Sequence, residues 1–229
     1  MGGGVLDELL RRNDRFCIRI LVRPSKKNIK WYKNYKKYTN LSVIWGDLMD
    51  YDTVLKAVTG SDYVLHMGGM VSPAADLHPE KTMKVNVTST QYIVDAIKAQ
   101  PNKDEIGLLF VGSIAELGNH LPPYHWGRVG DPICTSEFDY YSVSKCISEM
   151  IVSESGLKKW ASIRQSAMLY PKLLTKANNP TTFHVPLKGV LEWTTIEDSA
   201  NVMANACAAP HPHPWTQRTP PAQLTRTCR

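Results

Sequence analysis

Short apolar runs alternate along this chain with longer segments whose apolar positions recur at helical spacing. The runs are rich in β-branched and aromatic residues, as buried strands are, and they cover residues 17–22, 41–45, 62–67, 107–112 and 160–164. Helical spacing follows the second, third and fourth runs, at residues 52–59, 80–99 and 142–156. This alternation predicts βαβ units, and therefore an α/β fold whose doubly wound parallel sheet carries helices on both faces.

The two ends of the chain depart from this pattern. The chain opens with "MGGGVLDELLRR", which has helical spacing but no strand before it. No acidic residue follows Asp198, and residues 209–229 are rich in proline and polar side chains, so we expect a disordered tail. His211 and His213 lie in that tail, and we interpret them as an accident of composition rather than a metal site.

The composition is that of an ordinary globular protein, and the length is enough for one substantial domain or one and a half small ones. Of the 229 residues, 43% are hydrophobic and 21% are charged. No apolar run reaches the length of a membrane span, and the N-terminus lacks the apolar core of a signal peptide, so we expect a cytoplasmic protein without a membrane partner. The five cysteines are scattered without a C-x-x-C pair, which favours reduced thiols over disulfides or a zinc site.

The net charge of +6 is concentrated in one segment. Between Arg23 and Lys37 there are seven basic residues and no acidic one, with aromatic residues interleaved. Such a segment is compatible with nucleic-acid binding, with a solvated loop, or with recognition of a phosphate group on a small cofactor. A solvated loop is the plainest of the three, and we expect no nucleic-acid partner.

Charged, hydroxyl or glycine residues follow four of the predicted strands, at the edge where a doubly wound sheet binds ligands. Arg23 follows the first strand, where an arginine accommodates a 2′-phosphate and so favours NADP. Asp47 follows the second strand, and Gly68 and Gly69 follow the third, where absent side chains let a ligand approach the backbone. Ser113 follows the fourth strand, and its hydroxyl is placed to hydrogen-bond a reacting oxygen.

A tyrosine and a lysine lie four positions apart in "YYSVSK". Tyr141 and Lys145 would share one face of a helix. Because an ammonium group beside a phenol favours the phenolate, we expect Lys145 to lower the pKa of Tyr141 and make it a general acid/base. The plainer alternative is an amphipathic helix with one aromatic residue and one solvated lysine.

Taken in order, these segments resemble an extended short-chain dehydrogenase/reductase of the NAD-dependent epimerase/dehydratase family. The match runs from Gly2 to about Ala208, through "GGGVLDELL", "GDLMD", "DYVLHMGG", "VNVTST", "FVGSIAELG", "YYSVSK", "RQSAMLYP" and "TTIEDSANVM". The resemblance implies a Rossmann-like, NAD(P)-binding domain over residues 1–170, a partial substrate-binding lobe over residues 171–208, and the tail over residues 209–229.

The resemblance also implies roles for individual residues. Tyr141 would exchange a proton with the substrate oxygen, Ser113 would hold that oxygen, and Lys145 would bind the nicotinamide ribose. Hydride would pass between a substrate carbon and the nicotinamide, a step that the cofactor supplies. The cofactor-binding positions that the resemblance implies, besides Tyr141 and Lys145, are Gly2, Arg23, Asp47, Leu48, Gly68, Gly69 and Asn86. NADP is the expected cofactor, with NAD as the alternative.

The chain also departs from the family pattern. The family opens with a strand and a G-x-x-G-x-x-G turn that holds the pyrophosphate, and Gly2 falls on the last glycine of that turn. We therefore expect a sheet that lacks its first strand, a shortened substrate lobe, and weak dinucleotide binding by the chain as given.

The residues after Ser113 narrow the reaction. Sugar-nucleotide dehydratases of the family place an Asp–Glu pair directly after the catalytic hydroxyl, where this chain has Ile114 and Ala115. This difference disfavours a dehydratase. Glu116 comes one position late, and we interpret it as a solvated residue or a loop residue. Candidate pocket-lining residues in the following segment, residues 119–130, are His120, Tyr124, His125, Trp126 and Arg128.

The sequence thus predicts an NAD(P)-dependent oxidoreductase or epimerase-like enzyme that acts on a hydroxyl/carbonyl group of a small molecule. The alternative is a non-catalytic, truncated family member that no longer binds cofactor. A homodimer is compatible with either hypothesis.

Overall fold

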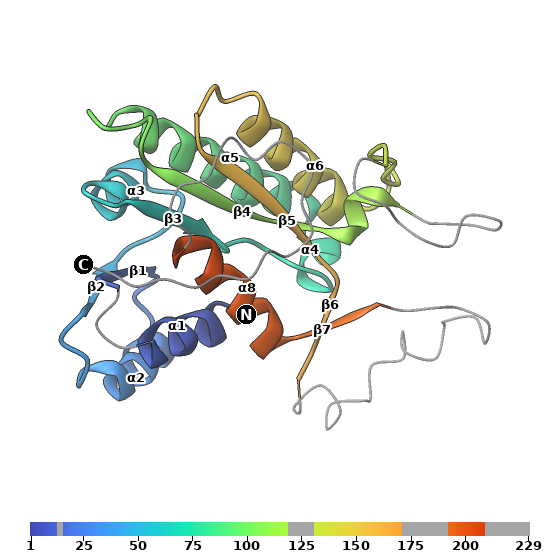
Figure 1. The fold of residues 1–229 in the computed structure, drawn as a ribbon. Coiled ribbons are helices and arrows are strands. Elements are labelled where there is room, and N and C mark those ends of the chain that lie inside the picture. The colour runs from blue at the N-terminus through green and yellow to red at the C-terminus, as the bar shows by residue number, and fades with distance from the viewer. Residues whose placement is uncertain (13–15, 119–130, 171–191, 209–229) are drawn as a thin grey trace.

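All five predicted strands are present in the computed structural model, which describes residues 1–12, 16–118, 131–170 and 192–208 (Figure 1). Each observed strand agrees with its predicted bounds to within one residue at either end. β1 (Ile18–Val22) pairs in parallel with β2 (Leu41–Trp45). β4 (Gly107–Ser113) pairs in parallel with both β3 (Tyr63–His66) and β5 (Trp160–Gln165). The α/β class with parallel strands is therefore confirmed.

Among the described residues, the strands form separate sheets rather than one continuous sheet. The first contains β1 and β2, and the second has the order β3-β4-β5. One edge of β1 and one edge of β3 pair with no described strand. A third pair, β6 (Ala167–Leu169) with β7 (Trp193–Thr195), is short and parallel and extends beyond β5 in the chain.

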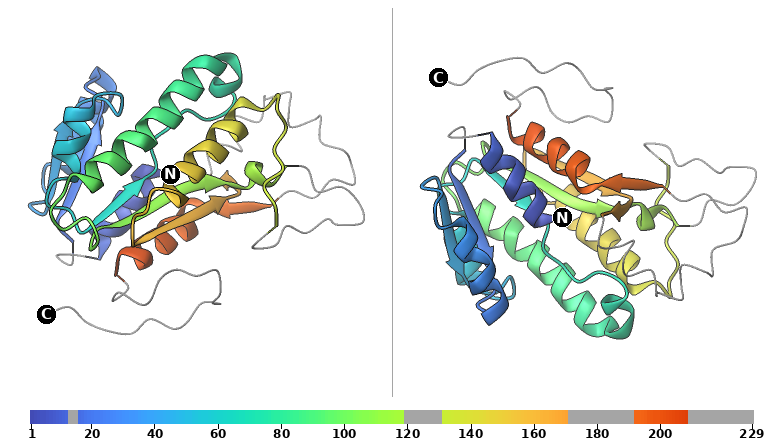
Figure 2. Two further views of the ribbon diagram at one scale, coloured as in Figure 1. Left: turned by 90° about the horizontal axis from the view of Figure 1, so that it is seen from above. Right: turned by 90° about the horizontal axis from the view of Figure 1, so that it is seen from below.

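The central strand β4 is buried along its whole length, and its side chains alternate between two hydrophobic clusters. Leu109 and Val111 belong to one cluster, which also holds residues of β1, α1 and α8. Leu108 and Phe110 belong to the other, which holds residues of α3, α5 and α6. Helices therefore cover both faces of the strands, as a doubly wound fold requires (Figure 2).

On one face lie α3 (Tyr51–Val58), the long α5 (Pro79–Lys98) and α6 (Tyr140–Ser153). All three fall within a few residues of the predicted helices. Asp50 caps α3 by accepting from the backbone of Asp52, and Asp139 caps α6 by accepting from the backbone of Ser142. The short α4 (Ala74–Leu77) lies just before α5. The Asp139 cap fixes where α6 begins, directly before Tyr141.

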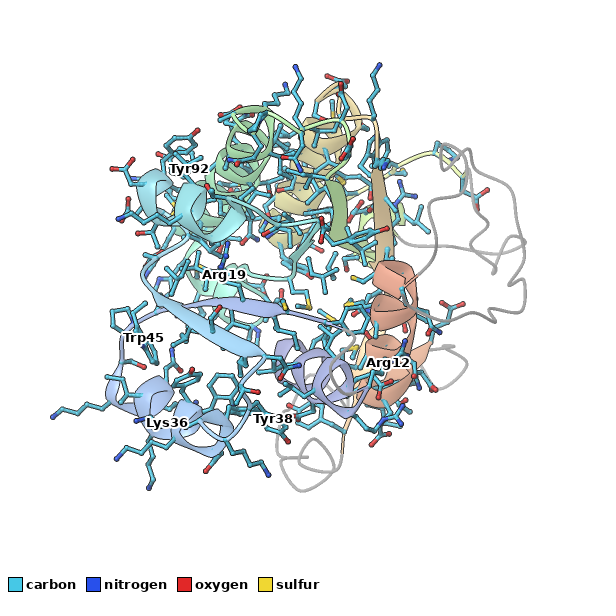
Figure 3. All side chains as sticks on the ribbon, turned by 60° about the vertical axis from the view of Figure 1, so that its left-hand side comes forward. Arg12, Arg19, Lys36, Tyr38, Trp45 and Tyr92 are labelled. Atoms are coloured by element: carbon cyan, nitrogen blue, oxygen red, sulfur yellow. The ribbon has the colours of Figure 1, made fainter. Side chains whose placement is uncertain are left out.

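On the other face, α1 (Gly2–Arg11) packs against α8 (Ile196–Ala208). The apolar pattern did not predict the helix α8. A Cβ atom at Gly4 would overlap the side chain of Ile196, so glycine permits this close approach of the two helices. At the far end, Arg12 donates to the side chains of Asn201 and Asn205 (Figure 3). The segment after residue 191 is thus joined to the N-terminal helix.

The basic segment is helical, so its interpretation as a solvated loop was wrong. Residues Lys26–Tyr32 form α2, capped by Ser25, and Lys33–Tyr35 continue as a 3-10 helix, η2. The lysines are exposed, and Lys36 follows directly after η2 (Figure 3). Trp31, Tyr32, Tyr35 and Tyr38 instead pack against the cluster that contains α1. The aromatic residues between the lysines therefore belong to the core.

In the part of the chain that the structure describes, no helix is both long enough and apolar enough to cross a membrane. The same residues contain no group of three or more His, Cys, Asp or Glu side chains placed to hold a metal ion. The four cysteines among them are free thiols: Cys17, Cys134, Cys146 and Cys207.

Candidate functional site

The predicted site residues lie where the parallel strands end. Arg23 follows β1, Asp47 follows β2, and Gly68 follows β3. Ser113 is the last residue of β4. Because parallel strands end at the same edge of a sheet, β3 and β4 deliver Gly68 and Ser113 to one edge of the β3-β4-β5 sheet.

The side chains of Ser113 and Tyr141 lie close enough for Ser113 to influence the pKa of the phenol. Ser113 is buried and caps a 3-10 helix, η3 (Ile114–Leu117), by accepting from the backbone N–H of Ala115 at 3.2 Å. Tyr141 lies in the first turn of α6. A strand end and a helix start thus bring together two hydroxyl groups that are 28 positions apart in the sequence.

The side chain of Ser142 fixes this meeting of η3 and α6. Its hydroxyl donates to the backbone carbonyl of Ala115 at 2.5 Å, and it also accepts from the hydroxyl of Thr135. Ser142 is fully buried. Since it directly follows Tyr141, its bond to η3 limits how far Tyr141 can move from Ser113.

Lys145 lies one helical turn after Tyr141 and is also buried. Its ammonium nitrogen donates to the backbone carbonyl of Val111 at 2.7 Å and lies 5.0 Å from the centre of the Phe110 ring. Burial lowers the pKa of Lys145 to about 8, while the charge of Glu116 opposes that shift.

The expected effect of Lys145 on Tyr141 was wrong in direction for this structure. Burial is the main cause that raises the pKa of Tyr141, and the charges of Glu116 and Asp139 add to it. The side chain of Ser113 opposes the rise. Lys145 is not among the groups that shift the pKa of Tyr141. The phenol is therefore held in its neutral, proton-donating form.

Gly68 and Gly69 pack closely against two other predicted cofactor-binding residues. A Cβ atom at Gly68 would overlap Cδ1 of Leu48, and one at Gly69 would lie 2.9 Å from Oδ1 of Asn86. The absent side chains therefore make room for protein groups at these positions. The structure brings Leu48, Gly68, Gly69 and Asn86 together as one group.

Asn86 connects this group to the helix that carries Tyr141. Its amide nitrogen donates to the carbonyl of Met70 at 3.0 Å and to the hydroxyl of Ser144 at 2.9 Å. Its amide oxygen accepts from the backbone N–H of Met70 at 2.7 Å. Asn86 is buried on α5 and so holds the loop after β3 against α6. A buried amide with all of these bonds satisfied rigidifies the site.

His66, at the end of β3, is a buried titratable residue that the sequence did not single out. Its Nε2 atom lies 2.9 Å from the hydroxyl oxygen of Thr90. Burial, aided by the positive charge of Lys145, lowers the pKa of His66 to about 3. His66 is therefore neutral at physiological pH, and its ring packs against the ring of Phe110.

The remaining predicted cofactor-binding residues are exposed. Oδ1 of Asp47 accepts from the backbone N–H of Met49 at 3.0 Å. Among the described residues, no ion pair or side-chain hydrogen bond of Arg23 is recorded, and a Cβ atom at Gly2 would meet no atom within 4 Å. These residues are not brought into contact with Ser113 or Tyr141. As an exposed carboxylate and an exposed guanidinium, Asp47 and Arg23 fit the amino and phosphate groups of a dinucleotide.

Glu116 is fully buried, so its interpretation as a solvated loop residue was wrong. Its carboxyl oxygen Oε1 accepts from the backbone N–H of Ser113 at 2.7 Å. Together with the bond from Ala115 to Ser113, this forms a capping box. The pattern S-x-x-E in "SIAE" is the sequence signal that could have predicted it.

The candidate pocket-lining residues lie outside the described residues, as do two histidines of the tail. The first set is His120, Tyr124, His125, Trp126 and Arg128, and the tail histidines are His211 and His213. The predictions for these residues, and for the ranges 171–191 and 209–229, stay predictions.

Known proteins resemble this chain in sequence and in fold. The family model of the 3-beta hydroxysteroid dehydrogenase/isomerase family matches residues 1–170. Over 121 residues, 52% of the chain, the sequence is 28% identical to 3 beta-hydroxysteroid dehydrogenase type 7 of Rattus norvegicus and 27% identical to that of Mus musculus. The aligned region spans about a third of these relatives, 35% and 32% of their lengths.

Solved structures share the fold at low sequence identity. DesIV, a dTDP-glucose 4,6-dehydratase from Streptomyces venezuelae solved with NAD, superposes with a TM-score of 0.71 at 17% identity, over 91% of this chain and 69% of that one. Pen from Bacillus thuringiensis gives a TM-score of 0.68 at 17% identity, over 90% of this chain and 61% of that one. The UDP-glucose 4-epimerase of Thermus thermophilus, in complex with NAD, gives 0.67 at 17% identity, over 90% and 70%. The predicted resemblance and the predicted fold class are confirmed.

Proposed function

Because the chain belongs to the 3-beta hydroxysteroid dehydrogenase/isomerase family, we propose that it interconverts a secondary hydroxyl and a carbonyl group with a nicotinamide dinucleotide. The observation that carries this proposal is the proximity of the Ser113 and Tyr141 side chains at the end of β4. It places a phenol, which can move a proton, beside a hydroxyl that can hold the same oxygen.

Tyr141 is the proposed general acid/base. Its phenol gives a proton to the carbonyl oxygen in the reductive direction and takes one from the hydroxyl in the oxidative direction. Ser113 orients the reacting oxygen toward that phenol. Burial favours the neutral phenol, which suits proton donation, and the side chain of Ser113 supports the phenolate needed for oxidation.

The bound nicotinamide would supply the hydride acceptor or donor. Lys145, Asp47 and Arg23 are the residues that would hold the dinucleotide. Asp47 offers an acceptor for the adenine end, and Arg23 offers a cation for a 2′-phosphate. We therefore propose NADP as the preferred cofactor and NAD as the alternative.

The proposed substrate class is a 3β-hydroxysteroid, on the strength of the family and of the curated relatives' names. The chain also has Ile114 and Ala115 directly after Ser113, with no carboxylate at either position. The absence of those acid/base groups supports simple alcohol–carbonyl interconversion over dehydration of a sugar.

A turnover assay tests this proposal. The 229-residue chain is incubated with a 3β-hydroxysteroid and NADP or NAD, and the absorbance of the reduced nicotinamide is followed. Ser113→Ala should reduce turnover roughly 100-fold or more, because the reacting oxygen loses its positioning group. Ser153→Ala, at the exposed end of α6, is the matched control and should leave turnover unchanged.

A second candidate function is a binding-deficient, non-catalytic chain, and two observations favour it. The ammonium group of Lys145 is already bound to Val111, and β1 and β3 each have an edge without a described strand partner. Calorimetric titration with NADPH separates the two candidates. Micromolar binding supports the enzyme, and no binding supports the second candidate.

A further inference from the structure

Gly112, the residue before Ser113, leaves space for a group of buried and partly buried polar side chains between β4, β5 and α6. A Cβ atom at Gly112 would lie 2.7 Å from Oε1 of Glu116, 3.0 Å from Oγ of Ser162 and 3.1 Å from Oε2 of Glu149. Any side chain at position 112 would therefore displace one of the two carboxyl groups. The glycine is what allows two acids to lie together at the end of β4.

Glu149 accepts the hydrogen bonds that the side-chain donors of this group make. Arg164 donates from Nη2 to Oε1 of Glu149 at 2.5 Å and from Nε to Oε2 at 3.2 Å. Ser162 donates its hydroxyl to Oε2 at 2.5 Å. Burial alone would raise the pKa of Glu149, but the hydrogen bonds from Arg164 and Ser162 outweigh it and hold that pKa below its ordinary value. Glu149 is the ionised member of the pair.

Glu116 has a free oxygen in the same place. Its Oε1 atom is bound to the N–H of Ser113, but its Oε2 atom is buried and has no hydrogen-bond partner among the described residues. The nearest cation is Nε of Arg164, at 3.4 Å. An ionised Glu116 would leave a buried carboxylate oxygen without a donor, beside a second carboxylate.

A single proton on Glu116 removes both unfavourable effects, the buried carboxylate oxygen without a donor and the repulsion between two carboxylates. If Oε2 of Glu116 carries it, the acid can donate to Glu149, and the pair holds a single negative charge opposite Arg164. Burial, together with the neighbouring carboxyl group of Glu149, raises the pKa of Glu116 to about 8. Glu116 is therefore a carboxylic acid at neutral pH.

The same carboxyl group reaches the reacting residues through Ser113. Oε1 of Glu116 holds the backbone N–H of Ser113, while the hydroxyl of Ser113 accepts from Ala115 and meets the side chain of Tyr141. The capping box therefore sets the orientation of the Ser113 hydroxyl. Glu116 makes no recorded hydrogen bond to Tyr141, so it acts on the phenol only through Ser113 and through its charge.

We propose that Glu116 is a positioning residue for the reaction: a single proton shared with Glu149 lets its carboxyl group hold the backbone of Ser113 and fix the Ser113 hydroxyl against Tyr141. This inference rests on the proposed function of the same site. The titratable and charged groups that face Glu116 are Glu149, Arg164, Cys146, Tyr141 and Lys145.

Loss of the shared proton changes the charge around the phenol. An ionised Glu116 raises the pKa values of both Tyr141 and Lys145. Burial raises the pKa of Cys146 to about 11, so that thiol stays neutral while Glu116 titrates. Alkaline ionisation of Glu116 therefore makes the phenolate of Tyr141 harder to form, and oxidation should slow above about pH 8.

The first test is stability against pH, measured by urea unfolding of the full chain. Between about pH 4.5 and pH 8 the folded chain keeps a proton on Glu116 that the unfolded chain has lost, so the Glu116 contribution to stability falls as pH rises. Glu116→Gln should remove this slope, because the amide keeps one acceptor and one donor without titrating. Glu154→Gln, at the exposed end of α6, is the matched control and should leave the slope unchanged. A parent-like slope in Glu116→Gln overturns the inference.

The second test separates positioning from packing. Glu116→Gln should keep turnover of a 3β-hydroxysteroid at pH 7 and lose the alkaline decline. Glu116→Ala should lower kcat about 100-fold with little change in KM, since Ser113 is no longer held. A parent-like kcat and pH profile in Glu116→Ala contradicts the proposal.

If no variant turns over any substrate, the proposed function fails, and Tyr141 itself reports on the inference. Its ionisation is followed by tyrosinate absorbance, with Tyr141→Phe as the blank. Glu116→Gln should lower the pKa of Tyr141, because it removes a nearby negative charge at alkaline pH. An unchanged titration overturns the inference without reference to catalysis.

Discussion

Lys145 donates a hydrogen bond from its ammonium nitrogen to the backbone carbonyl of Val111 at 2.7 Å. Val111 lies on β4, two residues before Ser113, so this bond ties the helix of Tyr141 to the strand of Ser113. The lysine is thereby a structural connection between the two proposed catalytic residues. It is also a buried amine, so its ionisation makes the stability of the chain depend on pH.

Lys145→Met should change how stability depends on alkaline pH. The folded chain has lost a proton from Lys145 above about pH 8, whereas the unfolded chain keeps it up to the ordinary value of 10.5, so unfolding takes up a proton in this range. The Lys145 contribution to stability therefore rises with pH from 8 to 10.5. Lys145→Met should remove that rise, as measured by urea unfolding at several pH values.

The exposed Lys98, at the end of α5, provides the control for this measurement. Lys98→Met should show the same alkaline rise as the parent chain. A rise that persists in Lys145→Met would mean that another group is responsible.

Arg23→Asp should reverse the cofactor preference. A charge-assisted hydrogen bond to a 2′-phosphate contributes roughly 1.5–3 kcal/mol before screening, and an aspartate in its place repels the phosphate. We expect NADPH affinity to fall roughly tenfold or more and NADH affinity to change little. Calorimetry with both nucleotides measures the two affinities.

Lys27→Asp makes the same charge change on the exposed side of α2 and is the control. It should weaken NADPH binding much less than Arg23→Asp. Equal losses in the two variants would assign the effect to the general field of the basic segment rather than to a contact with Arg23.

Gly68→Ala should destabilise the chain by roughly 1–3 kcal/mol, because the new methyl group overlaps a well-packed side chain. Its Cβ atom would meet Cδ1 of Leu48. Leu48→Ala in the same chain should restore part of this loss of stability. The double variant should therefore lose less unfolding free energy than the sum of the two single variants. Additive losses in urea unfolding would show that Leu48 and Gly68 do not touch.

The strands were predictable because their chemistry is local. β-Branched and aromatic runs such as "CIRILV" and "GLLFVG" are buried strands in almost any α/β context, and their ends fixed the positions of Arg23 and Ser113. The helix over residues 26–32 was missed because its exposed side carries Lys26, Lys27 and Lys30, while its aromatic residues pack inward. The lysines made the segment look solvated, although the aromatic side of this helix is buried by contact with α1.

The sequence predicted the residue types of the candidate site, but it did not predict the direction of the Tyr141 pKa shift or the protonation state of Glu116. The pairing of Ser113 with Tyr141 was expected from the family resemblance. The bond from Lys145 to Val111 and the burial of Glu116 depend on how α6 packs against β4 and on the space at Gly112. Neither the direction of the Tyr141 pKa nor the state of Glu116 can be derived from spacing alone, since both are set by tertiary burial.

The central claim is that Tyr141 moves the proton in a hydride-transfer reaction, and deuterium transfer tests it most directly. The chain is incubated with NADP and a 3β-hydroxysteroid deuterated at its carbinol carbon, and the recovered reduced nicotinamide is analysed by mass spectrometry. We expect deuterium in the nicotinamide with the parent chain and with Tyr140→Phe, the exposed neighbouring tyrosine. We expect a loss of roughly 100-fold or more with Tyr141→Phe, which keeps the ring and removes the proton donor. No deuterium in the nicotinamide with the parent chain, or equal transfer in the two variants, would contradict the claim.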